Sequence, residues 1–160
     1  MRIVNTGGTF NKVYDPIRGA LVVAQDNEAV LAILQAMRLS VPVDGLIYKD
    51  SLEMDESDRA KLCDYIAALQ EDAIVVVHGT DTMDKSAAYV AKRLKDKCIV
   101  FTGAMVPFSI DKAEASANLA LAIAKVQLAK EPGVFIAMHG LVACYDRIYK
   151  DKQKGIFCLK

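Results

Sequence analysis

The sequence lacks several features that would indicate a metal site, a secreted scaffold or a membrane protein. It has no tryptophan, four cysteines and two histidines in 160 residues. None of the cysteines forms a CxxC pair, and no cysteine–histidine cluster has the spacing of a zinc site. No apolar run approaches the ~20 residues that span a bilayer, and no signal-peptide pattern is visible. We therefore expect a cytoplasmic protein with buried, reduced thiols and no membrane partner.

An excess of charge of one sign is also missing. Lysine and arginine number 20, as do aspartate and glutamate, so the formal net charge is zero. Such a chain has no overall field to attract nucleic acid, and we expect no nucleic-acid partner. The common nucleotide-binding and hydrolase motifs GxGxxG, GxxxxGK[ST] and GxSxG do not occur.

The apolar residues that are present form a pattern typical of an α/β domain. Hydrophobic residues make up 53% and charged residues 25%, which fits one globular domain over residues 1–160. Short apolar runs alternate with longer amphipathic ones, as in a parallel sheet with crossover helices. The runs predict strands at residues 2–5, 45–49, 73–77, 98–101 and 134–138. The amphipathic stretches predict helices at residues 26–38, 57–69, 83–94 and 113–128. From residue 141 onward we expect short extended pieces.

Small polar residues follow four of the predicted strands. These segments are Thr6-Gly7-Gly8-Thr9, Asp50-Ser51, His78-Gly79-Thr80-Asp81-Thr82 and Thr102-Gly103-Ala104-Met105. In an open parallel sheet the turns after the strands share the carboxyl edge, where the ligand crevice forms. The sequence therefore predicts that hydroxyls, glycines and carboxylates from distant segments meet at one site.

The residue types in these segments fit acyl transfer. Gly8 allows a sharp turn, and Thr9 then offers a hydroxyl beside free backbone N–H groups. Asp81 opens a helix and fits a substrate ammonium group. A threonine hydroxyl needs a base, for which Lys150 and Tyr14 are candidates. The same residues also fit structural roles: the threonines and Asp81 as helix caps, and Lys150 as a solvated charge.

Three of these segments together resemble the N-terminal domain of the bacterial L-asparaginase/glutaminase family. They are Thr-Gly-Gly-Thr-Phe, His-Gly-Thr-Asp-Thr-Met and Thr-Gly-Ala-Met-Val-Pro, in the family's order, and the resemblance extends from residue 1 to about residue 151. It implies a three-layer α/β/α fold with a mostly parallel, twisted sheet of the flavodoxin-like kind. It also implies hydrolysis of L-asparagine to L-aspartate and ammonia, with no metal and no organic cofactor.

The resemblance assigns roles to individual residues. Thr9 is the expected nucleophile, and Tyr14, on the mobile loop after it, is expected to assist. Lys150 is expected to support proton transfer with Thr80 and Asp81. The remaining expected substrate contacts are Gly8, Asp50, Ser51, Leu52, Gly79 and Ala104.

Three departures from the family pattern affect these expectations. Leu52 stands where a polar residue often contacts the substrate. The segment Asp84-Lys85-Ser86 keeps only part of the family's acidic continuation. The family's smaller C-terminal domain has no counterpart in these residues, so we expect a homodimer or higher oligomer that closes the site with a partner copy.

The alternatives to an asparaginase are an enzyme acting on glutamine or a related amide, and a degenerate module that binds an amino acid without turnover. An ammonia-supplying amidotransferase subunit shares the fold, but it would carry further domains.

Overall fold

A six-stranded sheet forms the centre of the protein, which we describe from a computed structural model of residues 1–129 and 131–160. Its strand order is β4-β1-β5-β6-β7-β8, and only β8 is antiparallel to its neighbour. The strands are β1 (Arg2–Gly7), β4 (Val43–Lys49), β5 (Ala73–Val77), β6 (Cys98–Thr102), β7 (Gly133–Met138) and β8 (Leu141–Cys144). The central strands are apolar and β-branched because both faces of the sheet are covered.

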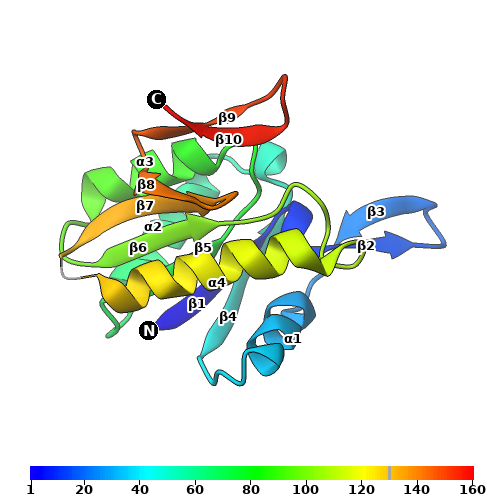
Figure 1. The fold of residues 1–160 in the computed structure, drawn as a ribbon, viewed down its shortest axis with the longest axis horizontal. Helices are drawn as coiled ribbons and strands as arrows, with labels where there is room; N and C mark the ends of the chain where they lie inside the picture. The colour runs from blue at the N-terminus through cyan, green and yellow to red at the C-terminus, as the bar shows by residue number, and fades with distance from the viewer. Residues whose placement is uncertain (130) are drawn as a thin grey trace.

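Two helices cover each face of this sheet. Helices α1 (Glu28–Ala36) and α4 (Lys112–Leu128) pack on one face, and α2 (Glu56–Ala68) and α3 (Met83–Arg93) pack on the other. Figure 1 shows α4 across the front of the sheet and α2 behind it. The two faces carry separate hydrophobic cores, since alternate residues of β5 belong to opposite clusters. The expected three-layer α/β/α fold is confirmed.

Every strand and helix predicted from the sequence is present, with ends within two residues of the prediction. Local chemistry sets several of these ends. Asp55 accepts a hydrogen bond from the Asp58 N–H and forms a capping box at the start of α2, and Asp111 caps α4. Within the described residues, no helix is long and apolar enough to cross a membrane.

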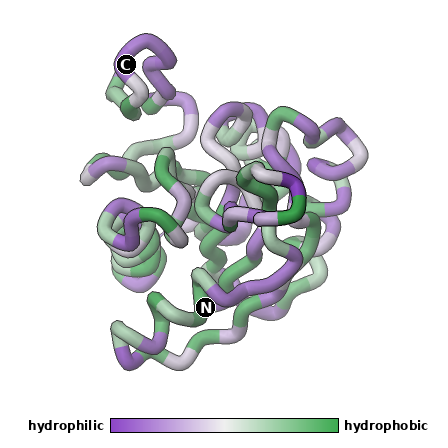
Figure 2. The backbone as a smooth tube through the Cα atoms, turned by 90° about the vertical axis from the view of Figure 1, so that its right-hand side faces the viewer, coloured by the Kyte–Doolittle hydropathy of each residue, from purple (hydrophilic) through white to green (hydrophobic). Residues whose placement is uncertain are grey.

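Two small antiparallel hairpins flank the sheet (Figure 1). The first joins β2 (Lys12–Asp15) to β3 (Ala20–Val23), and the second joins β9 (Ile148–Asp151) to β10 (Ile156–Leu159). The second hairpin confirms the short extended pieces expected near the C-terminus, and its tip is hydrophilic in Figure 2. The first corrects an expectation, because Tyr14 lies on strand β2 of a regular hairpin and not on a loop.

The expectation of buried thiols is correct for two cysteines. Cys63 and Cys98 are buried, whereas Cys144 is exposed and Cys158 is half-buried. Burial raises the pKa of both buried thiols, which keeps them protonated at neutral pH. Neither buried cysteine is therefore suited to act as a nucleophile.

Candidate active site

The strand order reverses beside β1, and this places two of the polar segments next to each other. From β1 the chain moves to β4 on one side and then to β5 on the other. Ligand crevices in open α/β sheets form at such a reversal, outside the carboxyl ends of the strands. The loops after β1 and β5, with Thr9 and Thr80, flank this point.

Glycines let these loops pack backbone against backbone. A Cβ atom on Gly8, whose φ is 75°, would lie 2.3 Å from the Gly79 Cα. A Cβ on Gly79 would lie 2.6 Å from the Ser51 Cβ, and one on Gly103 would lie 2.3 Å from the His78 carbonyl oxygen. Only glycine fits at such separations. The loops after β1, β4, β5 and β6 therefore meet, as the sequence predicted.

Lys150 joins this meeting point from the C-terminal hairpin. Its Nζ donates hydrogen bonds of 2.8 Å to the Thr80 Oγ1 and 2.8 Å to the Asp81 Oδ1. The Lys150 side chain is 13% exposed, and Thr80 is almost fully buried. Three of the predicted catalytic residues, from segments about seventy positions apart, therefore form one hydrogen-bonded group.

A second network fixes the hairpin that carries Lys150. His139 Nε2 lies 2.9 Å from the Glu114 Oε1, and His139 Nδ1 accepts a hydrogen bond from the Phe157 N–H. The Glu114 carboxylate also accepts from the N–H groups of Met105 and Val106 in the loop after β6. The buried side chains of Ile148 and Phe157 add apolar contact with the core. Sequence reasoning missed this network, since His139 had no visible partner near it in the chain.

Asp50 and Ser51 lie on the loop after β4, where the short 3-10 helix η2 (Ser51–Glu53) begins. The Asp50 carboxylate accepts a hydrogen bond from the Leu52 N–H and forms a 2.7 Å ion pair with Lys12. No pattern in the sequence predicts Lys12 at the site. Burial alone would raise the pKa of Asp50, but the Lys12 ammonium, the Leu52 N–H and the Lys150 charge outweigh it and hold this pKa below its usual range. Asp50 is thus a carboxylate at neutral pH.

The other predicted contacts on these loops differ in exposure. The Ser51 Oγ is buried and has no hydrogen-bond partner among residues 1–129 and 131–160. An unpaired buried hydroxyl is costly, so a ligand or water at this point would be favoured. Leu52 points outward with 69% exposure, whereas Ala104 is fully buried in a core cluster, which leaves only its backbone to face a ligand.

Thr9 and Tyr14 differ in their placement. Thr9 opens the short 3-10 helix η1 (Thr9–Asn11) directly after Gly8, and it is half-buried. Tyr14 is 64% exposed on the β2–β3 hairpin. Within the described part of the chain, neither hydroxyl is hydrogen-bonded to Thr80, Asp81 or Lys150. The structure thus brings the Thr9 loop to the site through Gly8, and it does not place Tyr14 in hydrogen-bond contact with the group.

His78 lies under the site as a neutral residue. It is fully buried, and its Nδ1 is 2.8 Å from the Gly79 carbonyl oxygen. Burial lowers the pKa of His78 from 6.5 to about 4, against the opposing effect of that carbonyl. The imidazole therefore supports the Gly79 backbone, as expected for a histidine at the end of a buried strand.

This burial predicts a pH dependence of stability. The unfolded chain protonates His78 below pH 6.5, whereas the folded chain does so only below about pH 4. The unfolded state holds more protons between these values, so the contribution of His78 is complete above pH 6.5. We expect a loss of about 3 kcal/mol in the free energy of unfolding as the pH falls to 4. Urea unfolding of the wild type and of His78→Asn at several pH values in this range measures this loss. If the free energy of unfolding fell equally with pH in both proteins, His78 would not be its source.

Comparison with known proteins identifies the family to which the fold belongs. The family model described as "Asparaginase, N-terminal" matches residues 1–159. A subunit of the glutamyl-tRNA(Gln) amidotransferase from Haloquadratum walsbyi is 31% identical over 150 residues, 88% of this chain and 33% of that protein. L-asparaginase 2 of Bacillus subtilis is 29% identical over 157 residues, 89% of this chain and 41% of that protein.

A solved structure extends the comparison to three dimensions. The probable cytoplasmic L-asparaginase from Campylobacter jejuni superposes with a TM-score of 0.84 at 26% identity, over 99% of this chain and 52% of that one. The chain spans a third to two-fifths of the length of the two curated relatives, and about half of the solved one. The similarity therefore covers nearly all of this chain but only part of each relative.

Proposed function

Because the chain belongs to the asparaginase family, we propose that it hydrolyses the side-chain amide of a small amino acid, namely L-asparagine, to give L-aspartate and ammonia. The observation that carries this proposal is the hydrogen-bonded group of Lys150, Thr80 and Asp81 at the reversal of the sheet. A largely buried amine between a hydroxyl and a carboxylate suits proton transfer.

The proposed reaction has two steps through Thr9. The Thr9 Oγ attacks the amide carbon of the substrate and gives up its proton, which passes by way of Thr80 and Lys150 to the leaving nitrogen. The C–N bond breaks, ammonia leaves and an aspartyl ester remains on Thr9. Water then attacks the ester carbonyl, which releases L-aspartate and returns the proton to the Thr9 oxygen. Backbone N–H groups of the turn after Gly8 would stabilise the oxyanion in both steps.

The substrate would be oriented by charge and by one free hydroxyl. Asp81 keeps one carboxylate oxygen outside its bond to Lys150, and this oxygen suits the substrate ammonium group. The unpartnered Ser51 Oγ suits the α-carboxylate. Asp50, held by Lys12, fixes the start of this loop. A cavity of about 530 Å³ adjoins Asp50 and Leu52 under the β2–β3 hairpin, and we propose it as the entry to the site.

Two features favour alternative functions for the chain. The similarity to a subunit of an amidotransferase favours a role as a subunit that releases ammonia for use by a partner protein. The outward position of Leu52 removes a polar contact and favours a broader amide specificity, with glutamine included, or binding without turnover. We also propose that a second copy of the chain completes the site, since Asp81 is one-third exposed. The similarity to a protein described as a probable cytoplasmic L-asparaginase supports the proposal that this protein is cytoplasmic.

Ammonia release tests the proposed function. The purified protein is incubated with L-asparagine and, separately, with L-glutamine, and ammonia is measured over time. We expect release from L-asparagine at the higher kcat/KM. Ammonia release from L-glutamine alone would show that the protein acts on glutamine and not on asparagine. If calorimetry showed binding of L-aspartate but neither amide released ammonia, the protein would be a binding module, and the proposal that it is an enzyme would be wrong.

A further inference from the structure

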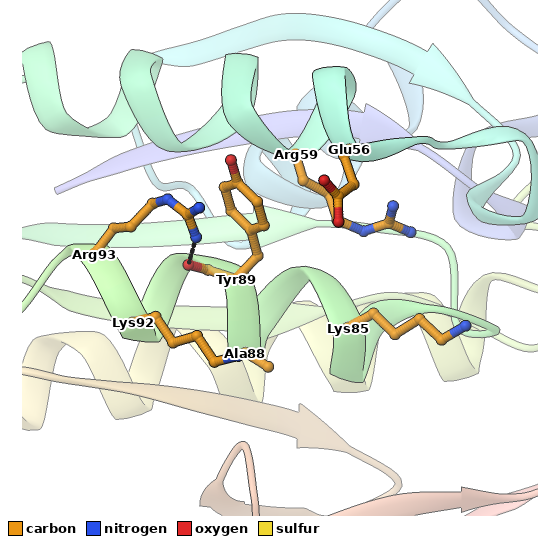
Figure 3. A pocket seen from close by; sticks show the side chains of 7 residues that line it. All are labelled: Glu56, Arg59, Lys85, Ala88, Tyr89, Lys92 and Arg93. Carbon is orange, nitrogen blue, oxygen red and sulfur yellow. Dashed lines mark hydrogen bonds between the residues drawn. The ribbon is translucent and has the colours of Figure 1, made fainter.

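A basic groove lies between α2 and α3. It has a volume of about 350 Å³, and its charged lining residues are Arg59, Lys85, Lys92, Arg93 and Glu56. Figure 3 shows Tyr89 standing between the two helices, with Arg93 on one side and Arg59 and Glu56 on the other. The groove uses none of the residues of the proposed catalytic group.

The charge of this groove is unbalanced. Four cationic side chains and one carboxylate line the groove, although the chain as a whole has zero net charge. Over residues 1–129 and 131–160, none of these five side chains takes part in a salt bridge. Like charges gathered without partners raise the local potential and attract an anion.

Helix stability explains only part of this cluster. Lys92 and Arg93 lie in the last turn of α3, where cations are favoured by the helix dipole. Lys85 is in the first turn of the same helix, where a cation is disfavoured. It also stands in the segment that departs from the acidic family pattern. Lys85 therefore has no evident role in folding, and its amine is available to a ligand.

The two arginines of the groove are held in place before any ligand binds. Arg59 is only 9% exposed, and its Nη2 donates to the Thr82 Oγ1 at 3.3 Å, while its buried Nε has no partner in the described structure. Arg93 stacks over the Tyr89 ring at 3.6 Å and donates to the Tyr89 carbonyl oxygen. Fixed guanidinium groups lose little entropy when they bind, and their donors match phosphate oxygens.

We propose that this groove binds a small phosphate-bearing molecule of the diphosphate class. Two arginines and two lysines can neutralise its charge, and the cavity is of small-molecule size. A free diphosphate and a nucleoside diphosphate share this chemistry. The groove also communicates with the candidate active site, because the Thr82 hydroxyl that accepts from Arg59 donates to the Ser51 carbonyl oxygen at 2.8 Å. A ligand that engages Arg59 changes the support of the loops after β4 and β5.

Calorimetric titration tests the binding site. Inorganic pyrophosphate and, in a second series, ADP are titrated into the wild type, Lys85→Ala and Lys61→Ala at low ionic strength. Lys61 is the matched control because it lies on α2, carries the same charge and is outside the groove. We expect Lys85→Ala to weaken binding about tenfold and Lys61→Ala to leave it unchanged. Tighter binding of ADP than of pyrophosphate would identify the nucleotide as the form recognised.

Three results would contradict the proposed binding site. The first is the absence of binding heat with either ligand, and the second is an equal loss of affinity in Lys85→Ala and Lys61→Ala. The third is a change of oligomeric state in Lys85→Ala, measured by light scattering. The last result would show that another copy of the chain covers the groove.

The communication with the active site rests on the proposed function and has its own readout. We expect pyrophosphate to change the KM for L-asparagine in the wild type and not in Lys85→Ala. An unchanged KM in a protein that binds pyrophosphate would refute the communication. A protein without ammonia release would refute the proposed function, and the titration would still decide the binding site.

Discussion

A Thr9→Ala protein is expected to fold normally and to release ammonia from L-asparagine about a thousandfold more slowly than the wild type, or slower still. The expected loss is large because the substitution removes the proposed nucleophile, for which no second hydroxyl of the same loop can substitute. Thr6 cannot replace it, since its buried hydroxyl donates to the Val77 carbonyl oxygen. The measurement is kcat/KM for ammonia release, with the melting temperature recorded beside it.

Two variants separate chemistry from folding in this experiment. Thr9→Ser keeps a hydroxyl and should retain most of the activity. Thr6→Ala, three residues earlier, should lower stability by about 1 kcal/mol through the loss of a buried hydrogen bond. A Thr9→Ala protein with activity within tenfold of the wild type would exclude Thr9 as the nucleophile.

A Lys150→Met protein is expected to lose activity by about a hundredfold to ten-thousandfold, mainly in kcat. The substitution keeps an unbranched side chain as far as the ε-carbon but removes the amine that joins the Thr80 Oγ1 to the Asp81 Oδ1. Stability should change little, because Asp81 is one-third exposed and water can replace the amine.

Lys152→Met provides the matched control for this variant. Lys152 lies two residues further along the same hairpin, is exposed and forms no hydrogen bond or salt bridge with Thr80 or Asp81. Full activity in Lys152→Met and strong loss in Lys150→Met are expected. Equal effects of the two substitutions would show that Lys150 acts only as a surface charge.

The sheet and its helices could be predicted from the sequence because local patterns determine them. The short β-branched run Ala-Ile-Val-Val-Val predicts a strand that is buried on both faces of the sheet, and β5 begins and ends where this run predicts. The hairpin of β2 and β3 has no clear sequence signal, since its strands have four residues each and none of these residues is fully buried. The resemblance to the family placed Tyr14 on a mobile loop, whereas the structure places it on β2.

The site was predictable where residues follow strands and unpredictable where partners come from far along the chain. The loops of Thr9, Asp50 and Thr80 lie at the carboxyl edge that the topology dictates. Lys150 resembled a solvated charge in its sequence context, and only the resemblance to a family placed it at the site. No local signal could show the pairing of Lys12 with Asp50 or of His139 with Glu114, because such contacts depend on the packed fold.

Rapid quenching of the reaction tests the central claim, that Thr9 forms an aspartyl ester in this site. The protein is mixed with L-asparagine, quenched in acid within milliseconds, digested and analysed by mass spectrometry. We expect a peptide with one aspartyl group attached at Thr9 in the wild type, and no such peptide in Thr9→Ala. Ammonia release with the aspartyl group on another residue, or undiminished release from Thr9→Ala, would contradict it.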